Sequence, residues 1–176
     1  MTTTTDGQLN QVNLGAVGAL VDAIKQSPSA AETTWSAEVR WTGAFRSEAA
    51  VRDFAPIPSD EPSALGGTDS APNPVEQLLG ALGNCLAVGY AANASVAGIT
   101  IRDLRIDLDG DIDLHAFLGL DPKTDGHAGF SAIRVAVRLD TDADEAAVAE
   151  LHRKVAATSP VGQTLSRAIS VEINPA

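Results

Sequence analysis

The stretch that decides the fold is Asn73-Pro74-Val75-Glu76-Gln77-Leu78-Leu79-Gly80-Ala81-Leu82-Gly83-Asn84-Cys85. Asn73 is a good N-cap, and Pro74 suits the first helical position, where no amide hydrogen is needed. Glu76 falls in the first turn, where the helix dipole favours an acid. Residues 74–97 are nearly all small or apolar, so we expect a central helix that is buried on almost every side. This helix carries Cys85, the only cysteine of the chain.

The composition indicates a soluble globular protein and restricts its partners. A length of 176 residues fits one domain, and a net charge of -11 argues against nucleic acid or an anionic membrane as partner. One cysteine excludes an intramolecular disulfide and a cysteine-rich metal site. The polar residues 1–8 do not form a secretion signal, so we expect a cytoplasmic protein.

Before the central helix, the sequence pattern predicts one helix and two strands. Apolar residues spaced by three and four predict an amphipathic helix over 10–26. Alternating residues predict strands over 35–41 and 45–54. Three prolines at 56, 58 and 62 then predict an extended loop without regular structure, which leads through 60–69 into the central helix.

After the central helix, the pattern predicts three strands and two helices. Gly98 is expected to end the central helix. The strands are expected at 99–113, with a bulge at Gly110, at 130–139 and at 168–173, and the helices at 142–158 and from Ser159-Pro160 to about residue 167. A loop is expected over 118–129. This order predicts an α+β domain with a mainly antiparallel sheet.

Four motifs carry a resemblance to a known family: Glu61-Pro62, Leu65-Gly66-Gly67-Thr68-Asp69, Asn73-Pro74-x-Glu76-x-Leu78-Leu79 and Ala81-Leu82-Gly83-Asn84-Cys85. They resemble the OsmC/Ohr family of thiol-dependent hydroperoxide reductases, and in particular its OsmC-like branch. The resemblance runs from about Trp35 to the end of the chain. It implies an α+β, OsmC/Ohr-like fold in which mainly antiparallel sheets wrap around long central helices in an intertwined homodimer. We therefore expect a flexible N-terminus at 1–9, an N-terminal helix at 10–30 and an OsmC-like domain at 31–176.

The resemblance places Cys85 at the position of the peroxidatic cysteine, whose thiolate attacks a peroxide and becomes a sulfenic acid. Without the resemblance, a lone cysteine in an apolar helix is usually a small hydrophobic residue, and both interpretations stay open. The family's second cysteine, in a Cys-Pro dipeptide after the second long helix, is replaced here by Ser159-Pro160. A serine cannot close a disulfide, and an N-cap hydroxyl is the better account of Ser159.

The residues that assist the thiol in the family are also changed. Its peroxidases begin the helix with Asn-Pro-Glu, but Val75 holds the glutamate position here and Glu76 lies one residue further, about 100° around the helix. Glu76 is therefore expected to be a structural acid of the first turn. Arg46 is the plausible equivalent of the family's arginine, whereas Arg40 and Arg52 are expected to be surface arginines of the strands.

The remaining motifs predict neither a metal nor a cofactor. His115, His127 and His152 are not at metal-ligand spacing. His152 precedes Ser159 by seven residues and could face the site, although a solvated position near the helix end is favoured. Gly66-Gly67 lacks the context of a phosphate-binding loop, and Ser159 lacks that of a hydrolase nucleophile.

Two functions of different classes remain. In the first, Cys85 and Arg46 form the catalytic pair of a one-cysteine thiol peroxidase, which reduces a small organic hydroperoxide in the oxidative stress response and needs an external thiol reductant. Glu76 and Ser159 are then candidate binding residues. In the second, a non-catalytic homodimer of the same fold binds a small hydrophobic ligand at its interface, and Cys85 is packing. The unbroken match around Cys85 favours the first.

Overall fold

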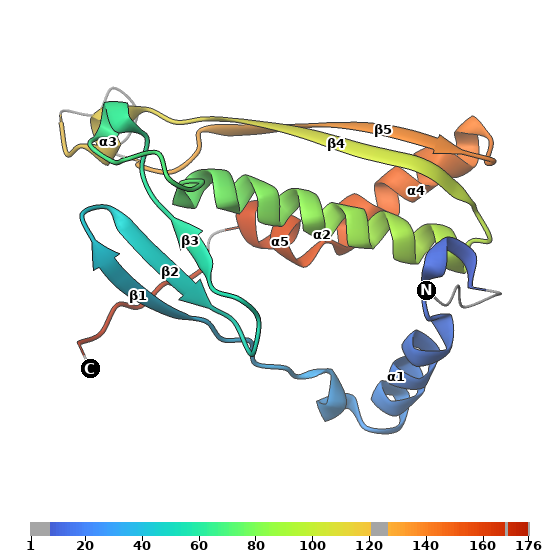
Figure 1. Cartoon of the computed structure of the whole chain (residues 1–176). Coiled ribbons are helices and arrows are strands. Elements are labelled where there is room, and N and C mark those ends of the chain that lie inside the picture. The colour runs from blue at the N-terminus through green and yellow to red at the C-terminus, as the bar shows by residue number, and fades with distance from the viewer. Residues whose placement is uncertain (1–7, 121–126, 168, 176) are drawn as a thin grey trace, which may run out of the picture. The chain divides into compact units, whose positions relative to one another are not determined.

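The computed structural model describes residues 8–120, 127–167 and 169–175 (Figure 1). The chain divides into two compact units. Unit 1 comprises the described residues of Met1–Val12 and Ala81–Ala176, and unit 2 comprises Asn13–Gly80. The long helix α2 (Pro74–Val96) begins in unit 2 and continues into unit 1.

The sheet of unit 1 is a long antiparallel pair, β4 (Ile101–Asp111) and β5 (Ala132–Thr141). It confirms both predicted strands, with bounds shifted by two residues. The bulge predicted at Gly110 is wrong, because Gly110 pairs in register with Ile133. Glycine is needed there for another reason, since a Cβ atom would lie 2.4 Å from the ring of Phe130.

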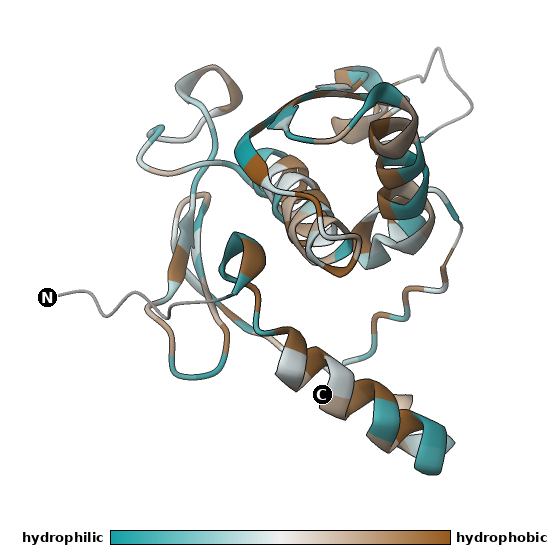
Figure 2. Ribbon diagram, turned by 90° about the vertical axis from the view of Figure 1, so that its right-hand side faces the viewer, coloured by the Kyte–Doolittle hydropathy of each residue, from teal (hydrophilic) through white to brown (hydrophobic). Residues whose placement is uncertain are grey.

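Two helices pack on the apolar face of this sheet and form the core of unit 1. They are α2 and α4 (Glu145–Thr158), which Figures 1 and 2 show alongside the β4–β5 pair. The buried core cluster consists of Tyr90, Ala94, Ile99, Leu151 and Val155. The helices approach closely at Gly89, where a Cβ atom would lie 3.1 Å from Val155. The short helix α5 (Pro160–Leu165) follows α4 directly.

The central helix has the predicted bounds but not the predicted burial. It begins at Pro74 and ends before Gly98, whose φ of +74° suits glycine. Its buried residues are Leu82, Tyr90, Ala94 and Ser95. Val88 and Val96 are 69% and 72% exposed, so one apolar face of the helix is open in this chain.

The N-terminal segment is attached to unit 1 by Asn10, in the short 3-10 turn η1 (Leu9–Gln11). The Asn10 amide donates to Ser95 Oγ and to the Ile99 carbonyl, and it accepts from the Ile101 amide. Asn10 has φ +53° and therefore cannot begin a helix. For this reason the helix predicted from residue 10 starts later, as α1 (Leu14–Gln26), with Asn13 as N-cap.

Unit 2 contains α1, the 3-10 turn η2 (Pro28–Ala31) and a three-stranded antiparallel sheet. The strands are β1 (Glu38–Gly43), β2 (Arg46–Ala50) and β3 (Ile57–Ser59). The second strand is shorter than predicted, because a turn with φ +50° at Arg52 interrupts it. The prediction that the prolines exclude a strand is wrong for Pro58, because β3 lies at the sheet edge, where a missing amide hydrogen is tolerated.

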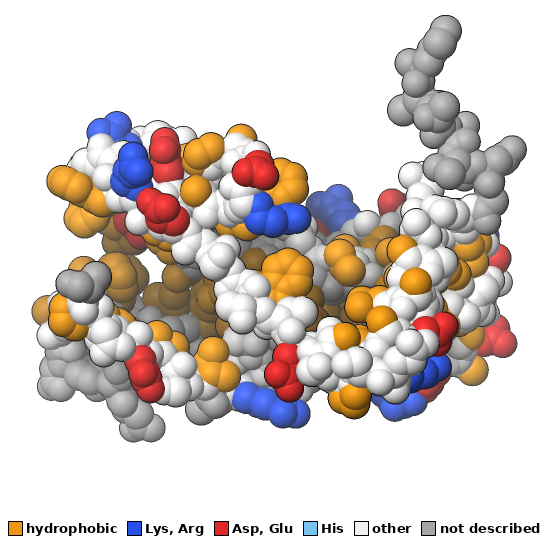
Figure 3. All heavy atoms as spheres, turned by 90° about the horizontal axis from the view of Figure 1, so that it is seen from below, with side chains coloured by type: hydrophobic (Ala, Val, Ile, Leu, Met, Phe, Trp, Pro, Cys, Tyr) orange, Lys and Arg blue, Asp and Glu red, His pale blue; other side chains and the backbone are white. Residues whose placement is uncertain are grey.

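The buried residues of unit 2 are Ser59, Asp60 and Asn73, all of them polar. Its apolar strand residues are largely open, with Val39, Trp41 and Ile57 between 49% and 73% exposed. Helix α1 is amphipathic, with hydrophobic and hydrophilic residues on different sides in Figure 2, and buries none of its residues. Hydrophobic side chains lie open on the surface shown in Figure 3. The chain alone therefore leaves much apolar surface uncovered.

The last predicted strand is not formed. Residues 169–175 contain no strand, and Ala168 lies outside the described residues. The alternating residues Ile169, Val171 and Ile173 are 61% to 93% exposed, and their segment is paired in neither of the two sheets that the described residues form. Part of the predicted loop, 121–126, is also outside the described residues, and a short helix α3 (Leu114–Phe117) precedes it.

Candidate active site

Cys85 and Ser159 lie next to each other in unit 1. Cys85 sits near the middle of α2, and Ser159 lies at the junction between α4 and α5. The Cys85 sulfur is 3.1 Å from Ser159 Oγ. Cys85 is partly exposed, whereas Ser159 is only 3% exposed. The thiol is therefore set against a buried hydroxyl rather than enclosed by apolar side chains alone.

The predicted N-cap role of Ser159 is observed. Its Oγ accepts the Gly162 amide at 3.1 Å, and Pro160 occupies the first position of α5. A Cβ atom at position 162 would lie 3.1 Å from this oxygen, so the helix start approaches the hydroxyl closely. The cap fixes the Ser159 side chain in the place where it meets the sulfur.

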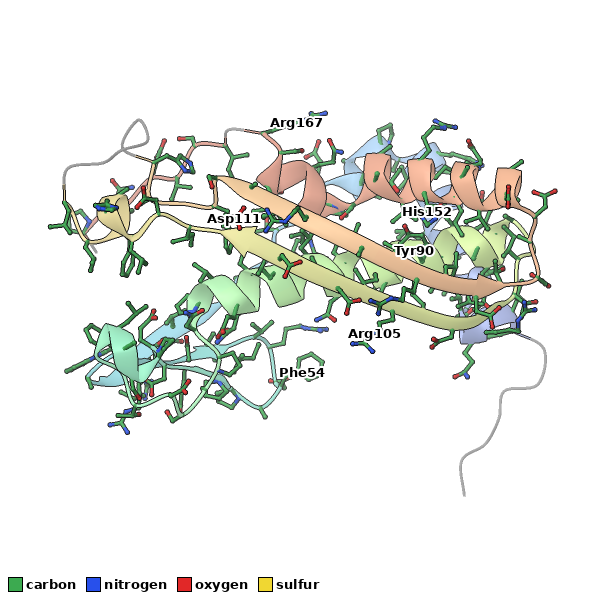
Figure 4. All side chains as sticks on the ribbon, turned by 90° about the horizontal axis from the view of Figure 1, so that it is seen from above. Phe54, Tyr90, Arg105, Asp111, His152 and Arg167 are labelled. Atoms are coloured by element: carbon green, nitrogen blue, oxygen red, sulfur yellow. The ribbon has the colours of Figure 1, made fainter. Side chains whose placement is uncertain are left out.

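A second polar contact joins the same two long helices. Tyr90 Oη lies 2.6 Å from His152 Nδ1, and the two rings meet edge to face with centroids 5.5 Å apart. Figure 4 shows the pair, with Tyr90 on α2 and His152 on α4. Tyr90 is 4% exposed, and burial raises the pKa of its hydroxyl. His152 is half-buried, because one edge of its ring meets Tyr90, so the solvated position expected for it is only partly observed.

Glu76 is engaged in a capping box at the start of α2. Its Oε2 accepts the Asn73 amide at 2.8 Å, and Asn73 Oδ1 accepts the Glu76 amide at 2.9 Å. Glu61 Oε2 accepts from the Asn73 side chain at 3.3 Å. This is the structural role expected of a first-turn acid, while a role of Glu76 in binding stays a prediction.

The loop before α2 is organised around a buried carboxylate that the sequence reasoning missed. Asp60 is 1% exposed, and its Oδ2 accepts the amides and the hydroxyls of both Thr68 and Ser70. Its Oδ1 accepts the Glu61 amide at 2.8 Å. These bonds, led by that from the Thr68 hydroxyl, hold the pKa of Asp60 well below its ordinary value.

The Asp60 loop also explains the glycine pair at 66 and 67. A Cβ atom on Gly67 would lie 1.8 Å from the Glu61 carbonyl oxygen, so only glycine fits. Thr68 and Ser70 lie eight and ten residues after Asp60. No simple spacing rule connects them, but an acid followed by a glycine pair, a threonine and a serine was the signal available in the sequence.

The three candidate arginines all lie in unit 2, and their surroundings differ. Arg40 faces Glu38 at 3.8 Å, and Arg52 stacks on the ring of Phe54 with 4.6 Å to its centroid. Within the part of the chain that the structure describes, Arg46 has neither a hydrogen-bond nor an ion-pair partner. Its guanidinium is therefore the one of the three that is free to meet a ligand.

Arg46 lines a pocket of about 350 Å³ within unit 2. Hydroxyls of Ser47, Ser59 and Ser70 and the Glu48 carboxylate also line it. The Ser59 and Ser70 hydroxyls donate to the Pro72 carbonyl and to Asp60, and each hydroxyl oxygen keeps the ability to accept a hydrogen bond. The pocket is polar and can take small hydrogen-bonding groups.

Neither a metal site nor a membrane span is indicated. Across the described residues, no group of three or more His, Cys, Asp or Glu side chains could hold a metal ion. His115 instead contacts Asp113 within its own turn, at 2.7 Å. No helix in the described part of the chain is both long and apolar enough to cross a membrane.

A family model identifies the family, and solved structures show the same fold. The family model described as "OsmC-like protein" matches residues 67–174. An OsmC-like protein of Mycoplasma pneumoniae is similar in structure, with a TM-score of 0.67 and 21% identity over 77% of this chain and 89% of that one. An OsmC-like protein of unknown function from Vibrio cholerae gives 0.63 and 9% identity over 76% and 94%. An organic hydroperoxide resistance protein OsmC of Legionella pneumophila gives 0.58 and 15% over 76% and 91%. The search of curated protein sequences finds no match.

Proposed function

Because this chain belongs to the OsmC-like protein family, we propose that it is a one-cysteine, thiol-dependent reductase of organic hydroperoxides. The similarity to an organic hydroperoxide resistance protein supports this class of substrate. The protein acts in the cytoplasm as part of the oxidative stress response, and it needs no metal or bound cofactor.

The observation that carries the proposal is the contact between Cys85 and Ser159. The thiol is partly exposed, so a small peroxide can reach it. The side chain 3.1 Å away is the one that stands in place of the family's second cysteine. The chain thus keeps the geometry of a reacting pair, with a hydroxyl instead of the second sulfur.

The reaction follows from having one sulfur. The Cys85 thiolate attacks the outer oxygen of ROOH; the O–O bond breaks, an S–O bond forms, and the alkoxide takes a proton to leave as ROH. Cys85 is then a sulfenic acid, oxidised by two electrons. An external thiol R′SH attacks its sulfur and releases water, which gives a mixed disulfide. A second R′SH displaces Cys85 as a thiol and leaves R′SSR′.

Arg46 is the candidate that steadies the peroxide. Among the described residues its guanidinium has no partner, Arg46 lines a polar pocket of unit 2, and a guanidinium can donate several hydrogen bonds to peroxide oxygens. Arg40 and Arg52 are less suited, because Glu38 and Phe54 already engage them. Replacing Arg46 with Lys is therefore expected to lower the peroxide rate more than replacing Arg40 with Lys.

The functional form is a homodimer. Two groups of apolar residues are open to solvent, Val88 and Val96 on α2 and Val39 and Trp41 on β1. Groups of exposed apolar residues are uncommon on soluble monomers and often mark an interface. The unpaired segment 169–175 has the alternation of a strand and would gain a partner from a second copy. Sedimentation equilibrium should give twice the chain mass of 18.1 kDa.

The test uses the native, purified protein. Cys85 is labelled with maleimide, and separate samples receive cumene hydroperoxide together with a reagent that traps sulfenic acid. We expect labelling without denaturant, a trapped sulfenic acid on Cys85, and peroxide turnover when dithiothreitol is added. Cys85→Ser is the control and should consume no peroxide. If Cys85 is labelled only after denaturation, the reductase proposal fails, and the alternative, a binding protein for a small hydrophobic ligand, takes its place.

A second variant tests the same pair of residues by adding a thiol at position 159. In the Ser159→Cys variant, the new thiol should attack the Cys85 sulfenic acid and form an intramolecular disulfide after one equivalent of peroxide. Mass spectrometry of the unreduced protein should show a loss of two hydrogens, and the sulfenic acid trap should no longer react. A variant that still accumulates a sulfenic acid would contradict the placement of these two side chains.

A further inference from the structure

The Ser159 hydroxyl has one hydrogen, and of its two contacts only the one with the Cys85 sulfur can receive it. An amide can only donate, so the contact with the Gly162 amide uses the serine oxygen as an acceptor. The other contact of the hydroxyl is with the Cys85 sulfur at 3.1 Å. When Cys85 is a thiolate, the sulfur can only accept, and the hydroxyl hydrogen must point at it.

We propose that Ser159 is a positioning residue, whose hydroxyl donates a hydrogen bond to the Cys85 thiolate and holds the sulfur for attack on the peroxide. This inference rests on the proposed function, because it assigns a role within that reaction. The serine is neither oxidised nor consumed. Its hydrogen bond to the thiolate is one to a charged group, which is stronger than a bond between neutral groups.

Capping alone does not require a hydroxyl at this position. The other capped helices of the described chain are capped by carboxylate or amide oxygens, from Asn13 in α1, Asn73 in α2, Asp113 in α3 and Asp144 in α4. An aspartate would cap α5 as well as a serine does. It has no hydrogen to donate at neutral pH and would place a negative charge beside the sulfur. A residue that both accepts from Gly162 and donates to Cys85 is what the site needs.

The surroundings offer a matched control. The Tyr90–His152 contact joins the same two long helices, five residues after Cys85 and seven before Ser159. Removing it loosens the helix pair without touching the sulfur. Any change of thiol reactivity that comes from helix packing should therefore appear in Tyr90→Phe as well.

The test is the rate of iodoacetamide alkylation of native Cys85 between pH 6 and 9. Ser159→Gly removes the hydroxyl but keeps a tolerable N-cap, since glycine costs a cap only a few tenths of a kcal/mol. We expect alkylation at pH 7 to fall about tenfold, with the pH profile displaced upward, because the lost hydrogen bond is one to a charged group. Ser159→Thr, which keeps a hydroxyl, should recover most of the rate.

Two controls separate this effect from structural damage. Asp144→Ala weakens the cap of α4, and Tyr90→Phe removes the second helix contact. Both should lower the thermal midpoint while the alkylation rate stays within about twofold of wild type. If Ser159→Gly reacts like wild type at every pH, or if all three variants slow equally, the positioning role is overturned.

The same data separate this inference from the proposed function. A wild-type protein that alkylates in a Ser159-dependent way but consumes no peroxide would refute the reductase and leave the hydrogen bond to the thiolate in place. A protein that turns over peroxide with a pH profile independent of Ser159 would keep the reductase and remove Ser159 from it.

Discussion

The two units of the chain are stabilised in opposite ways. Unit 1 has an apolar core in which Leu151 and Val155 are 2% and 1% exposed. Unit 2 buries only polar residues, and its centre is the Asp60 carboxylate with its ring of donors. Unit 1 is stabilised by its own core, which removes apolar surface from water. Unit 2 has a well-ordered loop but no apolar core of its own, so its stability must depend on surfaces that cover it.

Probes for each unit are already present in the sequence. Both tryptophans of the chain, Trp35 and Trp41, lie in unit 2. The only tyrosine of the chain, Tyr90, lies in unit 1. Tryptophan fluorescence therefore reports on unit 2, and hydrogen exchange at Leu151 reports on unit 1. With these two readings, each of the following variants can be assigned to one unit.

The largest effect is expected from the apolar core. Leu151→Ala leaves a cavity between α4 and α2 and should lower the free energy of unfolding by about 3 kcal/mol. The matched variant in unit 2 is Ile57→Ala, at a position 49% exposed, which should cost less than about 1 kcal/mol in a lone chain. Urea unfolding measures both.

Urea unfolding of both variants at several protein concentrations tests whether a second copy stabilises unit 2. If Ile57→Ala proves as harmful as Leu151→Ala, and the loss shrinks as the protein is concentrated, a second copy covers the unit 2 sheet. If Leu151→Ala lowers the free energy of unfolding by less than about 1 kcal/mol, the conclusion that the apolar core stabilises unit 1 is contradicted.

A smaller effect, which depends on pH, is expected at Asp60. Its pKa is lowered in the folded state from an ordinary value of 3.8, so its contribution is fully present above that pH. As the pH falls below about 4, the unfolded chain takes up a proton first, and the stability of the fold decreases. Asp60→Asn should lower the thermal midpoint at pH 6 by several degrees and flatten the decline between pH 5 and 3.

Other carboxylates contribute to the same decline. The pKa values of Asp111, Asp142 and Glu150 are also lowered, chiefly by hydrogen bonds from Arg134, from the Thr100 amide and from Arg153. The difference between the wild-type and Asp60→Asn curves, followed by tryptophan fluorescence, isolates Asp60. Two parallel curves would mean that Asp60 does not titrate differently on folding.

The smallest effect is expected in the β1–β2 turn. Ala44 has φ +52°, a left-handed conformation that costs alanine roughly 1 kcal/mol, while the Trp41 indole donates to its carbonyl. Ala44→Gly should stabilise unit 2 by about 0.5 to 1 kcal/mol. Ala49→Gly, in the extended strand β2, should destabilise by a similar amount. The same sign for both variants would refute the strain at Ala44.

The parts of the fold that could be predicted are those set by local chemistry. Asn73-Pro74, Gly98 and Ser159-Pro160 mark helix ends by their backbone preferences, and all three were placed correctly. The final strand was predicted by the same kind of reasoning and is wrong. Alternation in Ile169, Val171 and Ile173 shows that a segment could pair, but pairing needs a neighbour that the segment does not contain.

The site residues also divide into those that the sequence predicts and those that it does not. Cys85 and Ser159 could be named from the sequence, because a family pattern points to both positions. Asp60, and the contact between Tyr90 and His152, could not. Asp60 depends on donors brought back by the Gly66-Gly67 turn, and Tyr90 meets a histidine 62 residues away only once α2 and α4 have packed. Contacts of this kind arise from tertiary structure.

The hydrogen bonds of the Asn10 side chain with Ser95, Ile99 and Ile101 have a consequence for the whole chain. The polypeptide leaves unit 1 after Val12 and returns at Ala81, so unit 2 is an insertion whose two ends are both held by unit 1. As long as unit 1 stays folded, these hydrogen bonds make the 68-residue segment Asn13–Gly80 a closed loop, which has less conformational freedom when it unfolds alone than a free tail of the same length. A protease cut between η2 and β1 would then leave two fragments that stay together in solution. The short N-terminal piece would be retained by Asn10 rather than by any covalent bond.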